Sequence, residues 1–468
     1  MAGSTRDYNG NGDVGEGIAK EIEGLQAMLL RAIQAYGKEK AGKAIAYSAQ
    51  SYPYFFQDSN DNGQLDEAEA KTDNAYITWT PRLLKAAYNY QTSIKDPGAY
   101  ANNGKYIIQL VYDSIEDLNS TLTDKIDLSA AHRIDSGHFA GSQAAFRHWD
   151  GEGWLVPASC AKCHTATGLP FALAQNGTTI SMNATNGLAC TTCHDSLATY
   201  SRYAVGAVTF PSGAQIEFND SDSNLCLHCH QGRESKVSLD KAITASGTKD
   251  DQISDKLRFV NPHYFATGAT LFGTQAKGAY EYDGQVYNGR FMHLESFQTC
   301  TQCHNAHNLA INAEQCGACH GGIKTVEELK TIRNPGGDAT DYDGDGNVTE
   351  GLAGEIATMQ EKLYAALQAY AARTVKVGIV YSAPDYPYFF KDTNNNGKPD
   401  PDEVNSNNSY NAYSPRLLRA AYNYQWSIKD AGVYAHNAKY ILQVLYDSIK
   451  DLGGDVNGMT RPPTAATP

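Results

Sequence analysis

All ten cysteines of this chain lie in five copies of one pattern, Cys-x-x-Cys-His. The copies are Cys160, Cys163 and His164; Cys190, Cys193 and His194; Cys226, Cys229 and His230; Cys300, Cys303 and His304; and Cys316, Cys319 and His320. This spacing is the attachment signature of c-type haem. Two thiols one short turn apart can add to the two vinyl groups of one porphyrin, and the next imidazole can bind its iron as the proximal ligand. The sequence therefore predicts five covalent haem c groups.

Other uses of paired cysteines fit this pattern less well. A structural zinc site does not require a histidine after each pair, and a disulfide framework gives no reason for one. A thioredoxin-like redox pair occurs once, in a βαβ unit. Covalent haem is attached outside the cytoplasmic membrane, and the first ten residues contain no leader pattern. We therefore expect an exported protein, extracellular or at the cell surface, whose signal peptide is absent from this chain.

Eight of the thirteen histidines remain once each motif has taken one. A haem that only transfers electrons favours two axial imidazoles, whereas a haem that performs chemistry keeps one position open. Five histidines near the motifs would supply the distal ligands: His138, His148, His263, His293 and His307. His132 is a reserve candidate, and His228 lies inside its own motif. His436 belongs to a distant module, from which it could serve a haem of another copy.

The chain also contains a gap-free internal repeat, in which residues 7–118 match residues 341–452. The five residues from Tyr52 recur from Tyr386, and the four from Pro81 recur from Pro415. Such repeats mark duplicated structural units. We expect three parts, which are a first module over 1–125, a pentahaem core over 126–335 and a second copy of the module over 336–468.

Each module carries a loop with the spacing of an EF-hand calcium site. Oxygen ligands at alternating positions wrap the ion, a glycine permits the turn, and a final glutamate can bind through both oxygens. The candidate ligands are Asp58, Asn60, Asn62, Gln64, Asp66 and Glu69 in the first module, and Asp392, Asn394, Asn396, Lys398, Asp400 and Glu403 in the second. The alternative is a polar, solvated turn.

A weaker loop opens each module. Its candidate ligands are Asp7, Asn9, Asn11 and Asp13 in the first copy, and Asp341, Asp343, Asp345 and Asn347 in the second. Position twelve is apolar in both, so the closing ligand would be Glu16 or Glu21 in the first copy and Glu350 or Glu355 in the second. We therefore expect two to four Ca²⁺ ions.

The modules are predicted to be helical. Apolar residues recur at helical spacing at Ile18, Ile22, Leu25 and Leu29, an amphipathic helix is expected over 106–118, and each Pro-Arg-Leu-Leu suits a first helical turn. The haem segment has little periodicity, with hairpin candidates at 208–218 and 280–287. The expected fold is mainly α with much irregular loop and a few short β-hairpins. A multihaem core packed on its haems would lie between two helical calcium-loop modules.

The charge balance excludes some partners. With 52 acidic and 38 basic side chains the formal net charge is −14, which argues against a nucleic-acid binder or a protein held on anionic lipid. No apolar run is long enough to span a membrane. Five motifs within residues 160–320 leave too little chain to insulate the porphyrins from one another. Electron transfer through neighbouring haems is the function that this arrangement favours.

The haem segment, over residues 132–322, resembles extracellular multihaem c-type cytochromes of metal-respiring microbes, including filament-forming (nanowire) cytochromes. The matching motifs are Ser136-Gly-His138, Phe146-Arg-His148-Trp149, Val156-Pro-Ala-Ser-Cys160, Asn261-Pro-His263-Tyr264 and Phe297-Gln-Thr-Cys300. The resemblance implies bis-His irons and secreted electron carriers whose partners are other multihaem cytochromes, metal oxides or partner cells. In some relatives copies polymerise head to tail, with a distal histidine supplied across the interface.

Two other functions remain open. A nitrite-reductase-like multihaem oxidoreductase would need an open-faced haem, and its usual Cys-x-x-Cys-Lys motif is missing here. A calcium-dependent adhesion protein would bind through the modules whatever its redox state. We expect an electron carrier rather than an enzyme. The duplicated ends would either form a head-to-tail contact, as an open filament requires, or cap a monomer.

Overall fold

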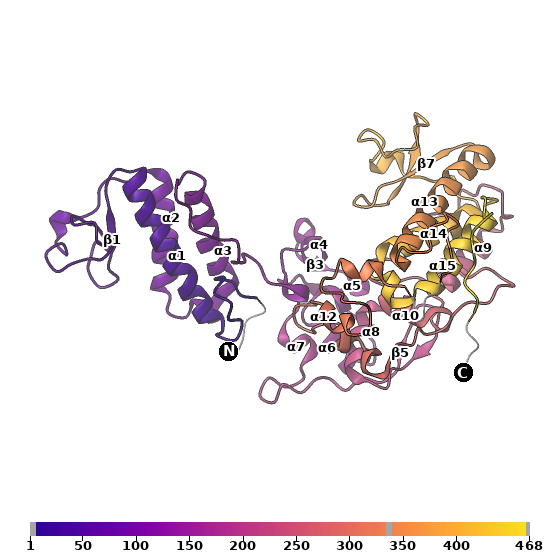
Figure 1. The fold of residues 1–468 in the computed structure, drawn as a ribbon, viewed down its shortest axis with the longest axis horizontal. Helices are drawn as coiled ribbons and strands as arrows, with labels where there is room; N and C mark the ends of the chain where they lie inside the picture. Colours follow the sequence, from indigo (N-terminus) through magenta and orange to yellow (C-terminus); the bar gives the residue numbers. More distant parts are fainter. Residues whose placement is uncertain (1–5, 334–338, 465–468) are drawn as a thin grey trace. The chain divides into compact units, whose positions relative to one another are not determined.

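The computed structural model describes residues 6–333 and 339–464. The chain divides into two compact units, Met1–Thr192 with Ala306–Ala310, and Cys193–Asn305 with Ile311–Pro468. Helices dominate, joined by long loops and a few two-stranded antiparallel sheets (Figure 1), which confirms the mainly helical prediction. No helix in the described ranges is long and apolar enough to cross a membrane. The expected boundary between residues 335 and 336 lies outside the described residues.

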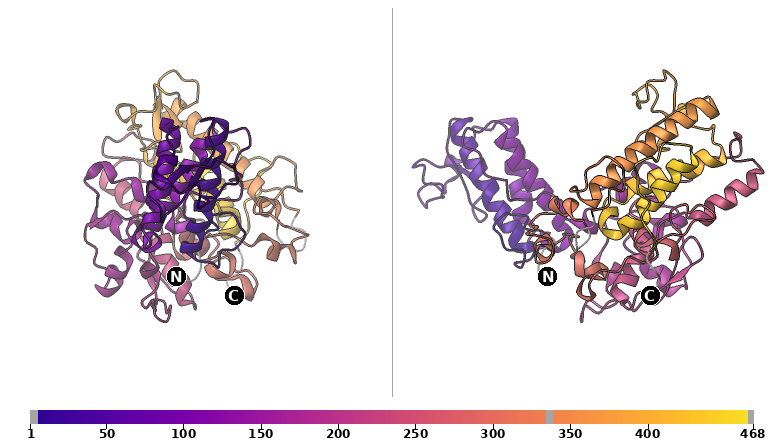
Figure 2. Two further views of the ribbon diagram at one scale, coloured as in Figure 1. Left: turned by 90° about the vertical axis from the view of Figure 1, so that its left-hand side faces the viewer. Right: turned by 45° about the vertical axis from the view of Figure 1, so that its right-hand side comes forward.

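The first module is built on three helices, α1 (Ile18–Glu39), α2 (Pro81–Lys95) and α3 (Ala99–Asn119), which lie side by side in Figures 1 and 2. The predicted apolar face of α1 forms the core, since Leu25 and Leu29 are fully buried. Pro81 opens α2 as expected, because its missing N–H is not needed in the first turn. A short antiparallel pair, β1 (Ile45–Tyr47) and β2 (Phe55–Gln57), leads into the turn η1 (Thr72–Asn74).

The second module has the same elements in the same order. Its helices are α13 (Leu352–Tyr370), α14 (Pro415–Lys429) and α15 (Val433–Asp451), and β7 (Gly378–Tyr381) pairs with β8 (Phe389–Asp392). A π-turn, η7 (Ala371–Val375), extends α13, and η8 (Ser406–Asn408) precedes α14. Even the backbone kinks correspond, at Asn103 in α3 and at Asn437 in α15.

Between the modules the elements are short. Those assigned to the first unit are η2 (Gly137–Phe139), α4 (Ala144–Arg147), η3 (Asp150–Glu152), β3 (Leu155–Val156), α5 (Ala158–His164), α6 (Gly168–Ala174) and β4 (Met182–Asn183), followed by α7 (Cys190–Cys193) at the boundary. Those of the second unit are β5 (Val208–Thr209), β6 (Gln215–Ile216), α8 (Ser221–His230), α9 (Lys236–Ser246), α10 (Thr267–Phe272), η4 (Gly273–Gln275), η5 (Glu295–Phe297), α11 (Cys300–Cys303), α12 (Ala313–Gly317) and η6 (Glu328–Thr331).

One of the two expected hairpins is present. Strands β5 and β6 pair antiparallel, with Val208 opposite Ile216, as predicted for 208–218. The prediction for 280–287 is wrong, because this segment forms a turn without strands. The reason is that the Asn423 side chain takes both backbone groups of Tyr280, accepting its N–H (2.7 Å) and donating to its carbonyl (2.9 Å).

Helix α10 and the segment after it pack on the second module. Trp426 of α14 is buried and donates its indole N–H to the hydroxyl of Thr270 in α10 (3.2 Å). Tyr422, one turn earlier, donates to the carbonyl of Gly278 (2.9 Å). By contrast, the apolar clusters at the first and last motifs are small. One contains Trp149, Val156 and Ala161, and the other Ala313, Ile323 and Leu329.

Candidate functional site

Each Cys-x-x-Cys-His motif begins in a short helical turn. The turns belong to α5, α7, α8, α11 and α12. Residues three apart share one side of a helix, so both thiols of a motif point the same way. In the last motif the turn continues beyond α12, since the N–H groups of Cys319 and His320 both bond to the carbonyl of Cys316.

The thiols are partly accessible in every motif, since none of the ten cysteines is fully buried. In α5 both Cys160 and Cys163 are half-buried, and in α8 the same is true of Cys226 and Cys229. The thiols of each pair are therefore accessible rather than enclosed in the fold. Covalent attachment at Cys163 and Cys229, as at the other eight thiols, stays a prediction of the motif spacing.

The proximal imidazoles are oriented by the backbone. The Nδ1 atoms of His164, His194 and His230 each lie 2.9 Å from a main-chain oxygen, of Ala145, Tyr200 and Phe265 respectively. An Nδ1–H bonded to a carbonyl fixes the tautomer in which Nε2 carries the lone pair, which is the usual arrangement of a metal-binding histidine. Burial lowers the pKa of His230, which also favours this neutral form.

Two pairs of imidazoles have the separation expected across one iron. Metal–nitrogen bonds of about 2 Å on each side of an iron place the two ring centroids about 6 Å apart. The rings of His293 and His320 are 6.1 Å apart, and those of His304 and His436 are 6.4 Å apart. Each pair contains one motif histidine and one histidine from outside the motifs. The donor set and its spacing therefore fit bis-His haem.

The other predicted distal histidines lie in loops and short turns. His138 is in η2, and the His307 ring lies 6.3 Å from that of Phe139 in the same turn. His148 ends α4 and meets Trp149 edge to face at 5.0 Å, while Trp149 lies 5.3 Å from His164 of the first motif. His263 has a left-handed backbone (φ 74°), and its N–H bonds to the Asn261 side chain (3.0 Å).

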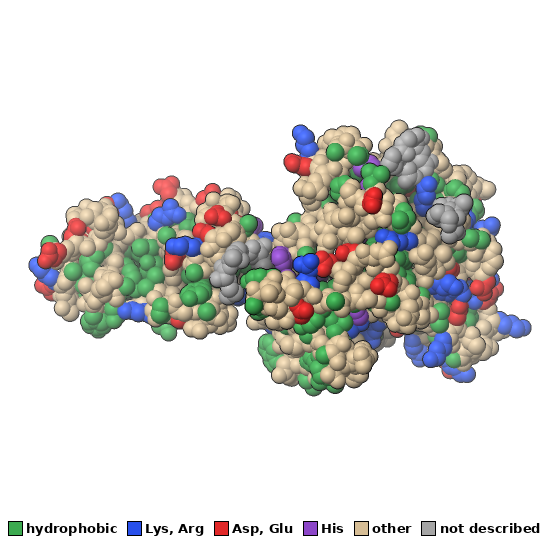
Figure 3. Space-filling model, turned by 90° about the horizontal axis from the view of Figure 1, so that it is seen from below, with side chains coloured by type: hydrophobic (Ala, Val, Ile, Leu, Met, Phe, Trp, Pro, Cys, Tyr) green, Lys and Arg blue, Asp and Glu red, His purple; other side chains and the backbone are tan. Residues whose placement is uncertain are grey.

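The two reserve histidines are in different surroundings. His132 lies beside Arg6, with its Nδ1 3.1 Å from the guanidinium. Burial and this cation lower the pKa of His132. His228 lies in α8 within its own motif, as the sequence requires. Histidine side chains reach the molecular surface in Figure 3.

His436 is the residue whose position the sequence did not predict. It lies in α15, half-buried, and its Nδ1 is 2.8 Å from the Asp430 carboxylate. Burial acts to lower the pKa of His436, but the charge and hydrogen bond of Asp430 outweigh it and raise the pKa. A signal was present in the repeat, since the matching residue of the first module is Asn102. A histidine that appears in only one copy of a duplicated module is a candidate for a specific role.

Neighbouring motifs meet in the second unit. The N–H of Cys300 donates to the Ser223 hydroxyl in α8 (3.0 Å). The neighbouring Cys226 thiol lowers the pKa of the Cys300 thiol to about 7, and Cys300 together with burial raises the pKa of Cys226. The residues that would hold the third and fourth haems are therefore direct neighbours.

The stronger candidate calcium loop of the second module brings its predicted ligands together. The Asn394 and Asn396 side chains both donate to the Asp400 carboxylate, at 2.8 and 2.6 Å, which brings positions 3, 5 and 9 together. Glu403 at position 12 is buried, with Oε1 accepting from the Thr393 N–H and Oε2 meeting no hydrogen-bond partner. Burial acts to raise the pKa of Glu403, yet the bonds from Thr393 and Asn394 lower it. A buried, ionised, half-satisfied carboxylate fits a cation ligand.

The strong loop of the first module has the same geometry. Asn60 and Asn62 donate to Asp66, at 2.6 and 3.0 Å, and the N–H of Ser59 donates to Oε1 of Glu69 (2.6 Å). The side chain of Gln64, like that of Lys398 in the second copy, lies at the surface. Asp58 and Asp392 open the two loops by accepting the N–H of Gly63 or Gly397, at 2.7 and 2.9 Å.

The opening loops also gather oxygen atoms. The second copy has two groups of three carboxylates, and within each group one oxygen from every residue lies within 4.8 Å of the others. The groups are Asp341, Asp343 and Asp345, and Asp343, Glu350 and Glu355. Burial raises the pKa of Asp343, and nearby Glu355 adds to it. Asn347 lies at the loop surface.

The first copy differs from the second at three of the four candidate ligands, with Asn9, Asn11 and Asp13 in place of Asp343, Asp345 and Asn347. Asn9 replaces Asp343 and donates to Glu16 (2.7 Å), while Glu21 accepts the N–H of Asn9 (3.0 Å). Asn11 also donates to Glu16 (2.9 Å), and Asp7 and Asp13 accept backbone N–H groups. The second copy therefore concentrates more negative charge than the first.

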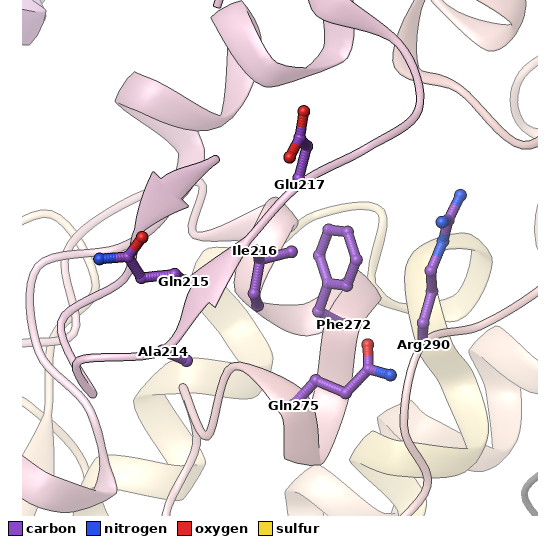
Figure 4. Close-up of a pocket in the computed structure, with 7 residues that line it drawn as sticks. All are labelled: Ala214, Gln215, Ile216, Glu217, Phe272, Gln275 and Arg290. Atoms are coloured by element: carbon purple, nitrogen blue, oxygen red, sulfur yellow. The ribbon is translucent and has the colours of Figure 1, made fainter. Parts of the chain in front are cut away.

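A shallow hollow of about 400 Å³ lies against the β5–β6 hairpin of the second unit (Figure 4). Its lining residues are Ala214, Gln215, Ile216, Glu217, Phe272, Gln275 and Arg290. The Arg290 guanidinium lies over the Phe218 ring, 4.3 Å from its centroid, and burial lowers the Arg290 pKa. The hollow contributes no cysteine or histidine, so the candidate site consists of the motif turns and the imidazoles around them.

Comparisons with known proteins identify polyhaem cytochromes as relatives of this chain. The chain is 29% identical over 360 residues to the C-type polyheme cytochrome OmcB of Geobacter sulfurreducens, covering 62% of this chain and 43% of OmcB. It is 28% identical over 421 residues to the C-type polyheme cytochrome OmcC of the same species, covering 79% of this chain and 51% of OmcC. The chain thus spans about half the length of the curated relatives it matches. No family model and no solved structure matches it.

Both relatives are polyhaem c-type cytochromes by name, as the five motifs predict for this chain. The aligned regions are longer than the haem segment alone, so the similarity is not confined to the short attachment motifs. The chain is therefore a relative of the polyhaem c-type cytochromes, and its predicted resemblance to multihaem cytochromes of metal-respiring microbes is confirmed.

Proposed function

We propose that this chain conducts electrons through five covalently attached, bis-His c-type haems. The observation that carries the proposal is the separation of the two imidazole pairs, His293 with His320 and His304 with His436. Each pair can close both axial positions of one iron, which favours electron transfer over substrate binding. When bound, haem supplies one-electron redox chemistry, while the chain fixes the axial ligands and the surrounding charge.

The arrangement of the motifs supports transfer between haems. Cys226 and Cys300 would anchor consecutive haem groups, and the bond from the Cys300 N–H to Ser223 brings the fourth motif against the helix that carries the third. The apolar clusters at the first and last motifs contain few side chains, so the porphyrins would complete the local core. Three irons remain, those of His164, His194 and His230, and we propose that their distal ligands come from the four histidines His138, His148, His263 and His307.

Calcium forms the second part of the proposal. The buried carboxylates of Glu69 and Glu403 close the two strong loops, and the opening loops of the modules add up to two further ions. Extracellular calcium modules commonly bind with Kd of about 10⁻⁴–10⁻³ M. Such affinities suit a protein that works outside the cell, which is also where covalent haem attachment places it.

The proposed setting is the cell surface or the extracellular space. Partners there are other multihaem cytochromes, metal oxides or partner cells, and the acidic net charge of −14 makes nucleic acid an unsuitable partner. Assembly into a head-to-tail filament is the remaining part of the proposal. Electron microscopy of the secreted protein tests it, because unbranched filaments with haem absorption support it and monodisperse particles refute it.

Haem stoichiometry and spin state test the central proposal. The pyridine haemochrome assay should give five haems per chain, and ferric EPR should show low-spin iron only. A high-spin signal in the wild-type protein would contradict complete bis-His ligation, and would favour an open-faced oxidoreductase of the nitrite-reductase type instead. A count below five would show that one of the motifs is not used.

A further inference from the structure

We propose that His436, from the second calcium module, is the distal ligand of the haem attached at Cys300, Cys303 and His304. The inference rests on the proposed function and assigns one of its ligands. It makes the second module part of a haem site, whereas the five histidines expected as distal ligands all lie in the haem segment itself.

The position of the His436 ring carries the proposal. Its centroid lies 6.4 Å from that of His304, the separation that two iron–nitrogen bonds of about 2 Å require. A histidine more than one hundred residues from the motif is therefore placed beside its proximal imidazole by the packing of α15.

The ring is held in the orientation that a ligand needs. Its Nδ1 lies 2.8 and 3.0 Å from the two oxygens of Asp430, so Nε2 is the nitrogen that can bind iron. Carboxylate–histidine–metal arrangements of this kind fix the tautomer and increase the basicity of the ligand. Asp430 is itself buried and accepts the N–H of Gly432 (3.1 Å). The ring lies against Gly432, where a Cβ would come within 2.6 Å of Cε1.

The first module provides an internal comparison. Its matching turn keeps the aspartate and the glycine, since Asp96 accepts the N–H of Gly98 (2.9 Å). Asn102 replaces the histidine, and its amide donates to both oxygens of Asp96 at 3.1 Å. The helix therefore keeps its geometry with an amide at this position, so its fold does not require a histidine. Only the second copy carries a side chain that can bind iron here.

The exchange His436→Asn tests the assignment, because it gives the second copy the residue of the first. Its haem count should stay at five, which reports correct attachment and folding. About one-fifth of the ferric iron should become high-spin, and the ferrous protein should bind about one CO per chain. Added imidazole should restore the low-spin spectrum. The control Asn102→Ala should remain low-spin throughout.

Two outcomes would overturn the assignment. If wild-type protein holds five low-spin haems and His436→Asn keeps all five low-spin, the inference fails while the proposed function stands. If wild-type protein itself contains high-spin haem, the proposed function fails first. A double serine exchange at Cys300 and Cys303 removes the fourth haem, and on that background His436→Asn should add no high-spin iron. A new high-spin signal there would assign His436 to another haem.

Asp430 is expected to act as a positioning residue. Asp430→Asn should leave the iron low-spin but weaken the bond to His436, so that cyanide displaces the ligand about 10- to 100-fold more readily. The midpoint potential of one haem should rise, because a less basic imidazole stabilises ferric iron less. The matched control is Asp96→Asn in the first module, which should change neither property. Equal behaviour of the two variants would contradict this role.

Discussion

Exchange of Glu403 for Gln should abolish calcium binding at the strong loop of the second module. In the wild-type chain Oε1 of Glu403 accepts the N–H groups of Thr393 and Asn394, at 2.6 and 3.2 Å. The amide oxygen of a glutamine can accept the same two hydrogen bonds. The exchange replaces Oε2, which is buried and meets no hydrogen-bond partner, by an amide group that cannot bind a cation. The change therefore removes one half of a bidentate ligand and little else.

The magnitude follows from mass action. With Kd of about 10⁻⁴–10⁻³ M and about 10 mM Ca²⁺, an occupied site stabilises the folded state by roughly 1.4–2.7 kcal/mol. This corresponds to an increase of about 3–10 °C in the Tm of a unit of this size. Without calcium the variant should lie within about 1 kcal/mol of wild type, because a buried charge is removed while the hydrogen bonds to the retained oxygen stay in place.

Calorimetry distinguishes the outcomes. Titration with Ca²⁺ should show one site fewer in Glu403→Gln than in wild type, and the calcium-induced rise in Tm should fall by the share of that site. Glu69→Gln, the matched change in the first module, should remove one site there and leave the response of the second module intact. An unchanged site count and an unchanged Tm shift in Glu403→Gln would refute the reasoning.

Three further changes test other parts of the structure. Burial raises the pKa of Asp343 and of Glu350, so without calcium the folded state favours their protonated forms. The free energy of unfolding in urea should therefore fall as the pH rises above the ordinary pKa values of these acids. Calcium should abolish this dependence on pH. Trp426→Thr, which copies the partly exposed Thr92 of the first module, should cost about 3–5 kcal/mol in denaturant unfolding, whereas Thr92→Ala should cost less than about 0.5. Burial lowers the pKa of Lys429 to about 7, so the folded state favours the neutral amine. The free energy of unfolding should therefore be highest at high pH and fall as the pH falls from about 10.5 to 7. Lys429→Met should remove this dependence, and a variant with the same pH profile as wild type would contradict the explanation.

Local sequence patterns predicted the helices of the modules because these depend on short-range spacing. The buried face of α1 follows from its apolar repeat, and α2 and α14 begin at the prolines that suit a first turn. The β5–β6 hairpin follows from its turn residues in the same way. The segment 280–287 has similar residues but no strands, since Asn423 from a distant helix takes its hydrogen bonds. Such competition is invisible in a local pattern.

The candidate site shows the same division. Cys-x-x-Cys-His spacing identifies thiols and proximal imidazoles because haem attachment needs them adjacent in sequence. A distal ligand has no such requirement, since it approaches the iron from the opposite side and from any part of the chain. His293 was predicted as a distal ligand because it lies close to the fourth motif in sequence, yet its ring lies across from His320 of the fifth motif. His436 reaches His304 only through the packing of α15.

The sequence by itself specified the five Cys-x-x-Cys-His motifs, the internal repeat with its helices and the loops that have the spacing of calcium sites, because each depends on residues close together along the chain. Only the tertiary structure decided how the two copies differ. Leu84 and Tyr88 on α2 are 53% and 72% exposed, whereas their counterparts on α14, Leu418 and Tyr422, are fully buried. The physical reason is that the segment after α10 packs on α14 and α15, which buries the same helix face that remains exposed on α2 and brings His436 beside a haem motif.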